Sequence, residues 1–153
     1  MKPPPEGWPR ISSALFYREP AKMIAWLCDA FGFEARLVVE GEGGRIEHSE
    51  LTYGKGGAGL IMVGRERTGE DAARFGVNMR SPQSADCNTQ TLMVYVDDVD
   101  AHCARARAKG AKIMDEPSVH DYGDGYWADR SYGALDPEGH AWWFSQRLRT
   151  AGQ

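Results

Sequence analysis

The chain has 153 residues, of which 42% are hydrophobic and 26% charged, and its formal net charge is -4. A chain of about 150 residues buries roughly 68–70% of its unfolded surface, so it can form a core without disulfides or a structural metal. Lysine and arginine are interleaved with aspartate and glutamate, which leaves no basic stripe for phosphates, so we expect no nucleic acid partner. No apolar run approaches the roughly 20 residues that span a bilayer, so we expect no membrane association.

The cysteines and the N-terminal segment indicate a cellular compartment. Cys28, Cys87 and Cys103 are odd in number and lack the spacing of a metal site. They are typical of free thiols in a reducing environment. The first residues contain no apolar stretch that would serve as a signal peptide. We therefore expect a cytoplasmic protein.

The first half of the chain predicts a strand, a helix and three further strands. Residues 1–10 carry four prolines and are expected to be a tail. The apolar run at 11–17 predicts a strand, and Pro20 then begins a helix that ends at Gly32. The three strands that follow, separated by glycine-rich turns, are expected at residues 34–39, 46–53 and 59–63.

The same order of elements restarts near residue 90. A strand is predicted first, followed by an acidic helix start, a helix that ends at Gly110, and three strands. Their expected ranges are 91–96, 97–100, 101–109, 111–114, 126–135 and 141–145. Gly110 follows Gly32 at the same offset at which Tyr95 follows Tyr17. This long period indicates that a whole βαβββ unit is duplicated.

We therefore expect an α/β (α+β) fold in a single domain at residues 11–147. One helix covers one face of each half-sheet, so the opposite face must meet another sheet or line a cavity. The function is expected in the cleft between the two modules. The expected boundaries are module one at 11–64, a polar linker at 65–89, module two at 90–147 and a C-terminal tail at 148–153.

Motifs in both halves resemble the glyoxalase/bleomycin resistance/dioxygenase family, the vicinal oxygen chelate superfamily. They are WLCDAFGF at 26–33, VDDVD at 96–100, KGA at 109–111, and DPEGH followed by AWWF at 136–144. The resemblance covers about residues 11–147. It implies two tandem βαβββ modules whose sheets form an open barrel around a central cleft, commonly in a homodimer.

The resemblance also implies a divalent metal site in the family's enzymes, with ligands on the first and last strand of each module, often His and Glu. The matching positions in this chain hold Ser12, Thr91, Trp143 and either Met62 or Val63. None is a histidine or a carboxylate, and Zn²⁺, Ni²⁺ or Fe²⁺ requires N, S or O ligands that these side chains supply poorly. We therefore expect no metal and no other cofactor.

His48 and Glu50 are a candidate polar pair. They lie two residues apart on a predicted strand, so both point to the same face. On a concave face they could hydrogen-bond a ligand, act as acid and base, or hold a metal at a relocated site. Alternatively, they lie on an exposed polar face without a role. His140 is expected to serve the turn before it, and His102 to be solvated in the first helical turn.

Aromatic residues concentrate in the second module, where strand alternation separates Trp142 from Trp143. Trp143 is expected in the cleft, in place of a metal ligand, and such rigid walls suit planar ligands. Alternatively, the aromatic residues fill the barrel core. Arg130 could clamp an anionic group or pair with Glu50 or Asp129. The expected ligand-binding set is Phe16 or Tyr17, His48, Glu50, Met62, Trp127 or Tyr132, Arg130 and Trp143.

Three classes of function remain open. The first is a metal-free protein that sequesters a small aromatic or amphipathic molecule, like the antibiotic-resistance members of the family. The second is a lyase, isomerase or dioxygenase-like enzyme that uses a non-standard metal or acid–base site around His48 and Glu50. The third is a regulatory module without a small ligand. The side chains at the implied metal positions favour the first class, with a homodimer as the expected assembly.

Overall fold

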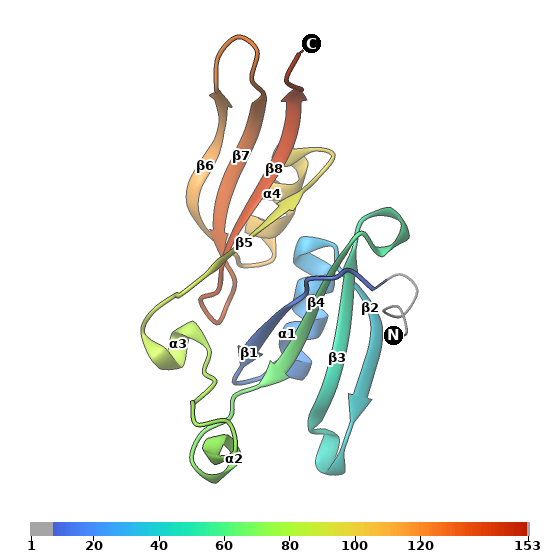
Figure 1. The fold of residues 1–153 in the computed structure, drawn as a ribbon, viewed down its shortest axis with the longest axis vertical. Coiled ribbons are helices and arrows are strands. Elements are labelled where there is room, and N and C mark those ends of the chain that lie inside the picture. The colour runs from blue at the N-terminus through green and yellow to red at the C-terminus, as the bar shows by residue number, and fades with distance from the viewer. Residues whose placement is uncertain (1–7, 153) are drawn as a thin grey trace. The chain divides into compact units, whose positions relative to one another are not determined.

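The computed structural model describes residues 8–152 and divides the chain into two compact units, Met1–Ala85 and Asp86–Gln153. Each unit contains one four-stranded mixed sheet (Figure 1). None of the helices in the described part of the chain has the length and apolar character that a membrane span requires.

The first unit has the strand order β1-β4-β3-β2, in which β1 runs parallel to β4 and the other pairs are antiparallel. Its strands are β1 (Ser13–Tyr17), β2 (Glu34–Glu40), β3 (Ile46–Tyr53) and β4 (Gly59–Arg65). The helix α1 (Pro20–Trp26) continues into the π-helical turn η1 (Leu27–Phe31), and short 3-10 turns lie at η2 (Glu42–Gly44) and η3 (Lys55–Gly57).

Helix α1 begins and ends where its sequence predicts. Pro20 lies in the first turn, where its missing N–H is not needed for helical hydrogen bonding. The wider turn of η1 brings the ring of Phe31 edge-on against Trp26, with 4.8 Å between ring centroids. Gly32 then ends the helix with φ 81°, a left-handed conformation that favours glycine.

In the first unit, α1 packs on β1, β3 and β4, and this covered face forms the core. Leu15, Leu51 and Val63 are fully buried there. The opposite side, which we name the first open face, carries Phe16 and Met62, since strand alternation directs them away from Leu15 and Val63.

Residues 65–85, within the segment expected as a linker at 65–89, belong to the first unit and make hydrogen bonds among themselves. The backbones of Arg67 and Met79 exchange two hydrogen bonds of 2.8 and 2.9 Å. The Ser81 amide donates to Oε1 of Glu66 at 2.8 Å. Two short helices, α2 (Glu70–Ala73) and α3 (Pro82–Ala85), complete this segment.

The second unit repeats the topology with the order β5-β8-β7-β6. Its elements are β5 (Thr91–Tyr95), α4 (Val99–Ala108), β6 (Lys112–Asp121), β7 (Ala128–Leu135) and β8 (Ala141–Arg149). Helix α4 packs on β6, β7 and β8, where Tyr132, Trp142 and Phe144 are fully buried. The ring of Phe144 stacks on Tyr132, with 5.1 Å between centroids.

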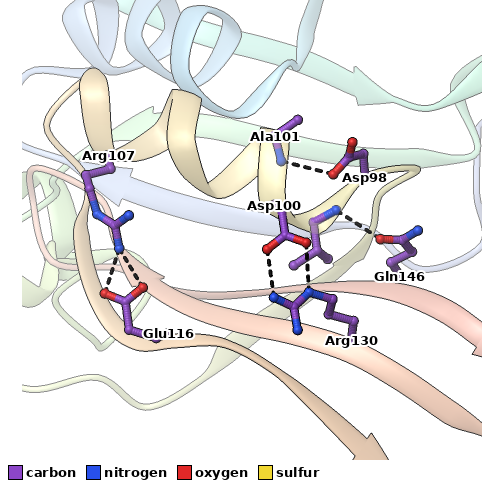
Figure 2. A network of polar contacts seen from close by, with 8 residues as sticks. Asp98, Asp100, Ala101, Arg107, Glu116, Arg130 and Gln146 are labelled. Atoms are coloured by element: carbon purple, nitrogen blue, oxygen red, sulfur yellow. Dashed lines mark hydrogen bonds and ion pairs between the residues drawn. The ribbon is translucent and has the colours of Figure 1, made fainter.

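Polar contacts fix the N-terminus of α4 (Figure 2). Asp98 caps the helix by accepting a 3.0 Å hydrogen bond from the amide of Ala101. The amide of Val99 donates to Oε1 of Gln146 on β8 at 3.2 Å. These two bonds satisfy amides that the first turn of a helix leaves unpaired.

Strands β6 and β8 are longer than the sequence predicts. The expected strand at 111–114 extends to Asp121, because Pro117 lies on an edge strand beside register shifts and no ladder bond is lost. Strand β8 enters the expected tail at 148–153, where Arg149 donates to Oδ1 of Asp121 at 2.6 Å.

Candidate functional site

The face of the second sheet opposite α4, which we name the second open face, is defined by strand register. Met93 on β5 is the register partner of Trp143 on β8, which in turn pairs with Gly133 on β7. Partners in register point to the same side of a sheet, so these residues form a row across neighbouring strands. Trp142, one residue earlier, points to the covered face and is fully buried.

The indole of Trp143 lies close to the backbone of Gly133, which has no side chain. A Cβ atom at Gly133 would lie 3.3 Å from Cη2 of Trp143 and 3.3 Å from Cε of Met114. The indole therefore occupies the space above the glycine, and the methyl group of Met114 adjoins it from β6. Met93 is 61% exposed at the other end of the row. The second open face thus presents a partly exposed apolar strip.

A polar cluster lies further along β8 on the same face. Arg147 donates from Nε to Oδ1 of Asp129 at 2.5 Å and from Nη2 to the Tyr95 hydroxyl at 2.5 Å. The Tyr95 hydroxyl donates to Oδ2 of Asp129 at 3.3 Å. The guanidinium lies 5.4 Å from the centroid of the Tyr95 ring and 5.7 Å from that of Trp127. The hydrogen bond to Asp129 raises the pKa of Arg147.

The first open face carries its own polar cluster. Nε2 of His48 lies 3.0 Å from Oε1 of Glu50, and Nε of Arg36 lies 3.3 Å from Oε2 of the same carboxylate. Glu50 is 7% exposed, whereas the side chain of His48 is 41% exposed. A carboxylate that holds an accessible imidazole can orient it for hydrogen bonding or for proton transfer.

The sequence profile of the Glyoxalase/Bleomycin resistance protein/Dioxygenase superfamily matches residues 10–144. The chain belongs to this superfamily. TioX from Micromonospora sp. ML1 is similar in structure, with 30% identity, a TM-score of 0.63, and coverage of 90% of this chain and 95% of TioX. No curated protein sequence matches the chain.

Two more distant structures share the fold of the superfamily. A glyoxalase/bleomycin resistance protein/dioxygenase family enzyme from Burkholderia phytofirmans PsJN has 21% identity and a TM-score of 0.59, covering 90% of this chain and 97% of that one. TnmS3, an antibiotic binding protein from Streptomyces sp. CB03234, has 22% identity and a TM-score of 0.57, covering 90% and 92%. At these identities the likeness concerns the fold.

The superfamily fold separates the expected ligand-binding residues between two faces. Phe16, His48, Glu50 and Met62 lie on the first open face, and Trp143 lies on the second. Trp127 lies against Arg147 and therefore at the second open face as well. Strand alternation thus places Phe16, and not Tyr17, on the first open face.

Three expected ligand-binding residues lie on the covered faces instead. Tyr17 and Tyr132 are fully buried, and the Tyr132 hydroxyl lies 2.6 Å from Nδ1 of His102. Arg130 binds Asp100 at the start of α4, with Nε and Nη2 at 2.9 and 2.7 Å from the two carboxylate oxygens (Figure 2). Each of them alternates along its strand with a residue of the open face.

His102 also differs from its expectation. It is 6% exposed instead of solvated, because α4 turns it onto the sheet, where its ring packs 4.3 Å from that of Phe144. His140 serves the turn, and its amide donates to Asp136 at 3.0 Å. Asp136 is buried and also accepts a 3.1 Å hydrogen bond from Nε1 of Trp142, so its carboxylate stabilises this turn.

The implied metal positions hold side chains that do not fit a metal. Met62 and Trp143 lie on the open faces, whereas Val63 lies in the core. Thr91 pairs with Ala141 at the start of β5, and Ser12 directly precedes β1. Within residues 8–152, no three His, Cys, Asp or Glu side chains converge as metal ligands. Thioether, indole and hydroxyl groups are poor ligands for Zn²⁺ or Fe²⁺, so these positions do not fit the metal of the family's enzymes.

The sequence interpretation missed the residues that share the second open face with Trp143. Arg147 could have been found from alternation alone, because it lies on the same strand and face as Trp143. Met93 and Tyr95 become neighbours of that strand only through the parallel pairing of β5 with β8. That pairing is a property of the topology and leaves no local signal in the sequence.

Proposed function

We propose that the protein binds and sequesters a small planar aromatic or amphipathic molecule, without a metal, on the second open face. The observation that carries the proposal is the row of Met93, Trp143, Gly133 and Met114 across the sheet. A large ring that lies against a glycine, with flexible thioethers beside it, offers a surface on which another ring can stack. Trp143 takes the place that the family's enzymes give to a metal ligand.

The affinity expected of such a surface is moderate. Stacking on an aromatic ring contributes about 0.5–1.5 kcal/mol beyond area burial. Burying about 200 Å² of apolar ligand surface adds about 5 kcal/mol before the costs of association. Micromolar dissociation constants are therefore expected.

Two further observations support the proposal. One of the structures with this fold is an antibiotic binding protein, which is consistent with ligand capture by the fold. The proposal includes a cytoplasmic location, which the three unpaired cysteines Cys28, Cys87 and Cys103 support.

The test is isothermal titration with bleomycin, doxorubicin and 8-anilinonaphthalene-1-sulfonate as probes. At least one probe is expected to bind in the micromolar range, and Trp143→Ala should weaken that binding about tenfold or more. Trp26→Ala is the matched control, since Trp26 is a partly exposed tryptophan on α1 of the other unit. Unchanged binding by Trp143→Ala, or the absence of binding by all three probes, would contradict the proposal.

A second candidate function is catalysis at the first open face, which the 3.0 Å contact between His48 and Glu50 favours. The superfamily includes glyoxalases, so the hemithioacetal of methylglyoxal and glutathione is the first substrate to test, with and without added Ni²⁺ or Zn²⁺. The protein would be shown to be an enzyme if it turns this substrate over faster than the spontaneous reaction, if Glu50→Gln abolishes that turnover, and if Glu47→Gln leaves it unchanged. Glu47 is an exposed neighbour on the same strand.

A further inference from the structure

The guanidinium of Arg147 is fixed in place at the second open face. Nε is held by Asp129 and Nη2 by the Tyr95 hydroxyl. The rings of Tyr95 and Trp127 lie within 5.4 and 5.7 Å of the guanidinium carbon. An arginine held in this way has lost most of its side-chain freedom before any ligand arrives. Ligand binding therefore costs less side-chain entropy.

The fixed guanidinium still has donors to offer. Its hydrogen bonds to Asp129 and Tyr95 use Nε and Nη2, so Nη1 is directed at neither of them. The side chain of Arg147 is 36% exposed, whereas that of Asp129 is 10% exposed and both carboxylate oxygens accept hydrogen bonds. The carboxylate is therefore the inner partner, and the positive group is the one that a ligand meets.

Arg147 and Trp143 lie at positions that one ligand can reach together. Both point to the same side of β8, four residues apart, which corresponds to about 13 Å along a strand. Between them lies Ser145, whose hydroxyl is buried and bonded to that of Ser131 at 2.8 Å. A ring system of about three fused rings, stacked on the indole, would bring a terminal substituent to the guanidinium.

We infer that the ligand of the second open face is a planar polycyclic molecule with a terminal oxyanion, such as a carboxylate, which Arg147 binds. The inference rests on the proposed function and names the chemical class of its ligand. A guanidinium attracts an oxyanion through its opposite charge and can donate to two carboxylate oxygens, whereas a neutral amide offers one carbonyl oxygen and no charge. The oxyanion therefore binds more tightly than its neutral analogue.

The test compares 2-anthracenecarboxylate with 2-anthracenecarboxamide, which have the same rings and differ in charge. Wild-type protein is expected to bind the carboxylate about fivefold more tightly than the amide, or more. The double variant Arg147→Met/Asp129→Asn removes both charges, so no buried charge is left unpaired and the fold is retained. It should bind the two probes equally.

Arg130→Gln is the matched control. Arg130 also binds a carboxylate and lies on the neighbouring strand β7, but on the covered face. The Arg130→Gln variant should therefore keep the wild-type preference for 2-anthracenecarboxylate over the carboxamide. Thermal melting of each variant confirms that it is folded.

The remaining outcomes separate this inference from the proposed function. Equal binding of carboxylate and amide by wild type, with both weakened by Trp143→Ala, would overturn the role of Arg147 and leave the aromatic site intact. A preference for the carboxylate that survives in the double variant would also overturn it. If neither probe binds, the inference is wrong, and the probe panel around Trp143 decides the proposed function on its own.

Discussion

Two strand glycines differ in what lies above them, and this difference links stability to the proposed site. A Cβ atom at Gly64 would lie 3.6 Å from the ring of Phe16, an ordinary contact, whereas one at Gly133 would crowd Trp143 and Met114 at 3.3 Å. Neither glycine has a positive φ, so backbone strain does not enter. The two positions therefore form a matched pair.

Gly64→Ala is expected to stabilise the protein by about 0.4–1 kcal/mol, because alanine restricts the unfolded chain. Gly133→Ala should give no such gain and should weaken probe binding, because the indole of Trp143 must shift from the strand. Urea denaturation and titration of the two variants measure both effects. Unchanged probe binding by Gly133→Ala would show that the contact of Trp143 with Gly133 is not required.

At the scale of residues, strand alternation in the sequence predicted some positions and missed others. It placed Trp143 and Trp142 on opposite faces, as the structure shows. It also grouped Arg130 with Tyr132, but could not say which side of their strand faces the helix. That choice depends on burial of the aromatic ring under α4, which is a tertiary effect.

At the scale of elements, two bidentate arginine–carboxylate pairs attach α4 to its sheet (Figure 2). Asp100 pairs with Arg130, and Arg107 donates from Nη2 to both oxygens of Glu116 at 2.6 Å. The hydrogen bond from Arg130 lowers the pKa of Asp100 below its ordinary value. Both pairs are solvent-exposed, so salt should screen them.

The lowered pKa of Asp100 gives a pH-dependent prediction. A carboxylate with a depressed folded pKa adds stability above its unfolded pKa of about 3.9 and loses it as the pH falls through the folded value. Wild type should therefore exceed Asp100→Asn in urea midpoint at about pH 6 and lose that advantage below about pH 3. Arg130→Gln should lose the same pH-dependent contribution. An advantage of wild type that persists undiminished at about pH 2.5 would refute the assignment.

Element boundaries followed the local signals where such signals exist. Pro20, Gly32 and Gly110 mark helix ends in the sequence, and the structure places helix termini beside each of them. The extension of β6 through Pro117 could not be predicted, because proline normally excludes a strand and is tolerated here by the edge position. The π-helical turn at Leu27–Phe31 likewise has no signal in the periodicity.

At the scale of the molecule, the repeated order of elements predicted the two sheets. The strand orders β1-β4-β3-β2 and β5-β8-β7-β6 are the same pattern, as the constant offset between the halves indicates. The segment at 65–89 was predicted as linker because it is polar. Its residues 65–85 belong to the first unit, and the backbone hydrogen bonds between Arg67 and Met79 inside the segment cannot be predicted from composition.

We propose that the protein is a homodimer in which a second copy covers apolar surface on the first open face. Leu37 and Val39 on β2 are each 42% exposed, beside the buried Glu50 and the partly exposed His48 with which they pair in register. Contiguous exposed apolar surface is typical of association sites. Light scattering at micromolar concentration should give twice the 17.0 kDa chain mass. The variant Leu37→Lys/Val39→Lys should be monomeric, and Val77→Lys, at an exposed position outside the sheets, should stay dimeric. A monomeric wild type would contradict the proposed dimer. A double variant that keeps the dimer mass would show that Leu37 and Val39 do not lie in the interface.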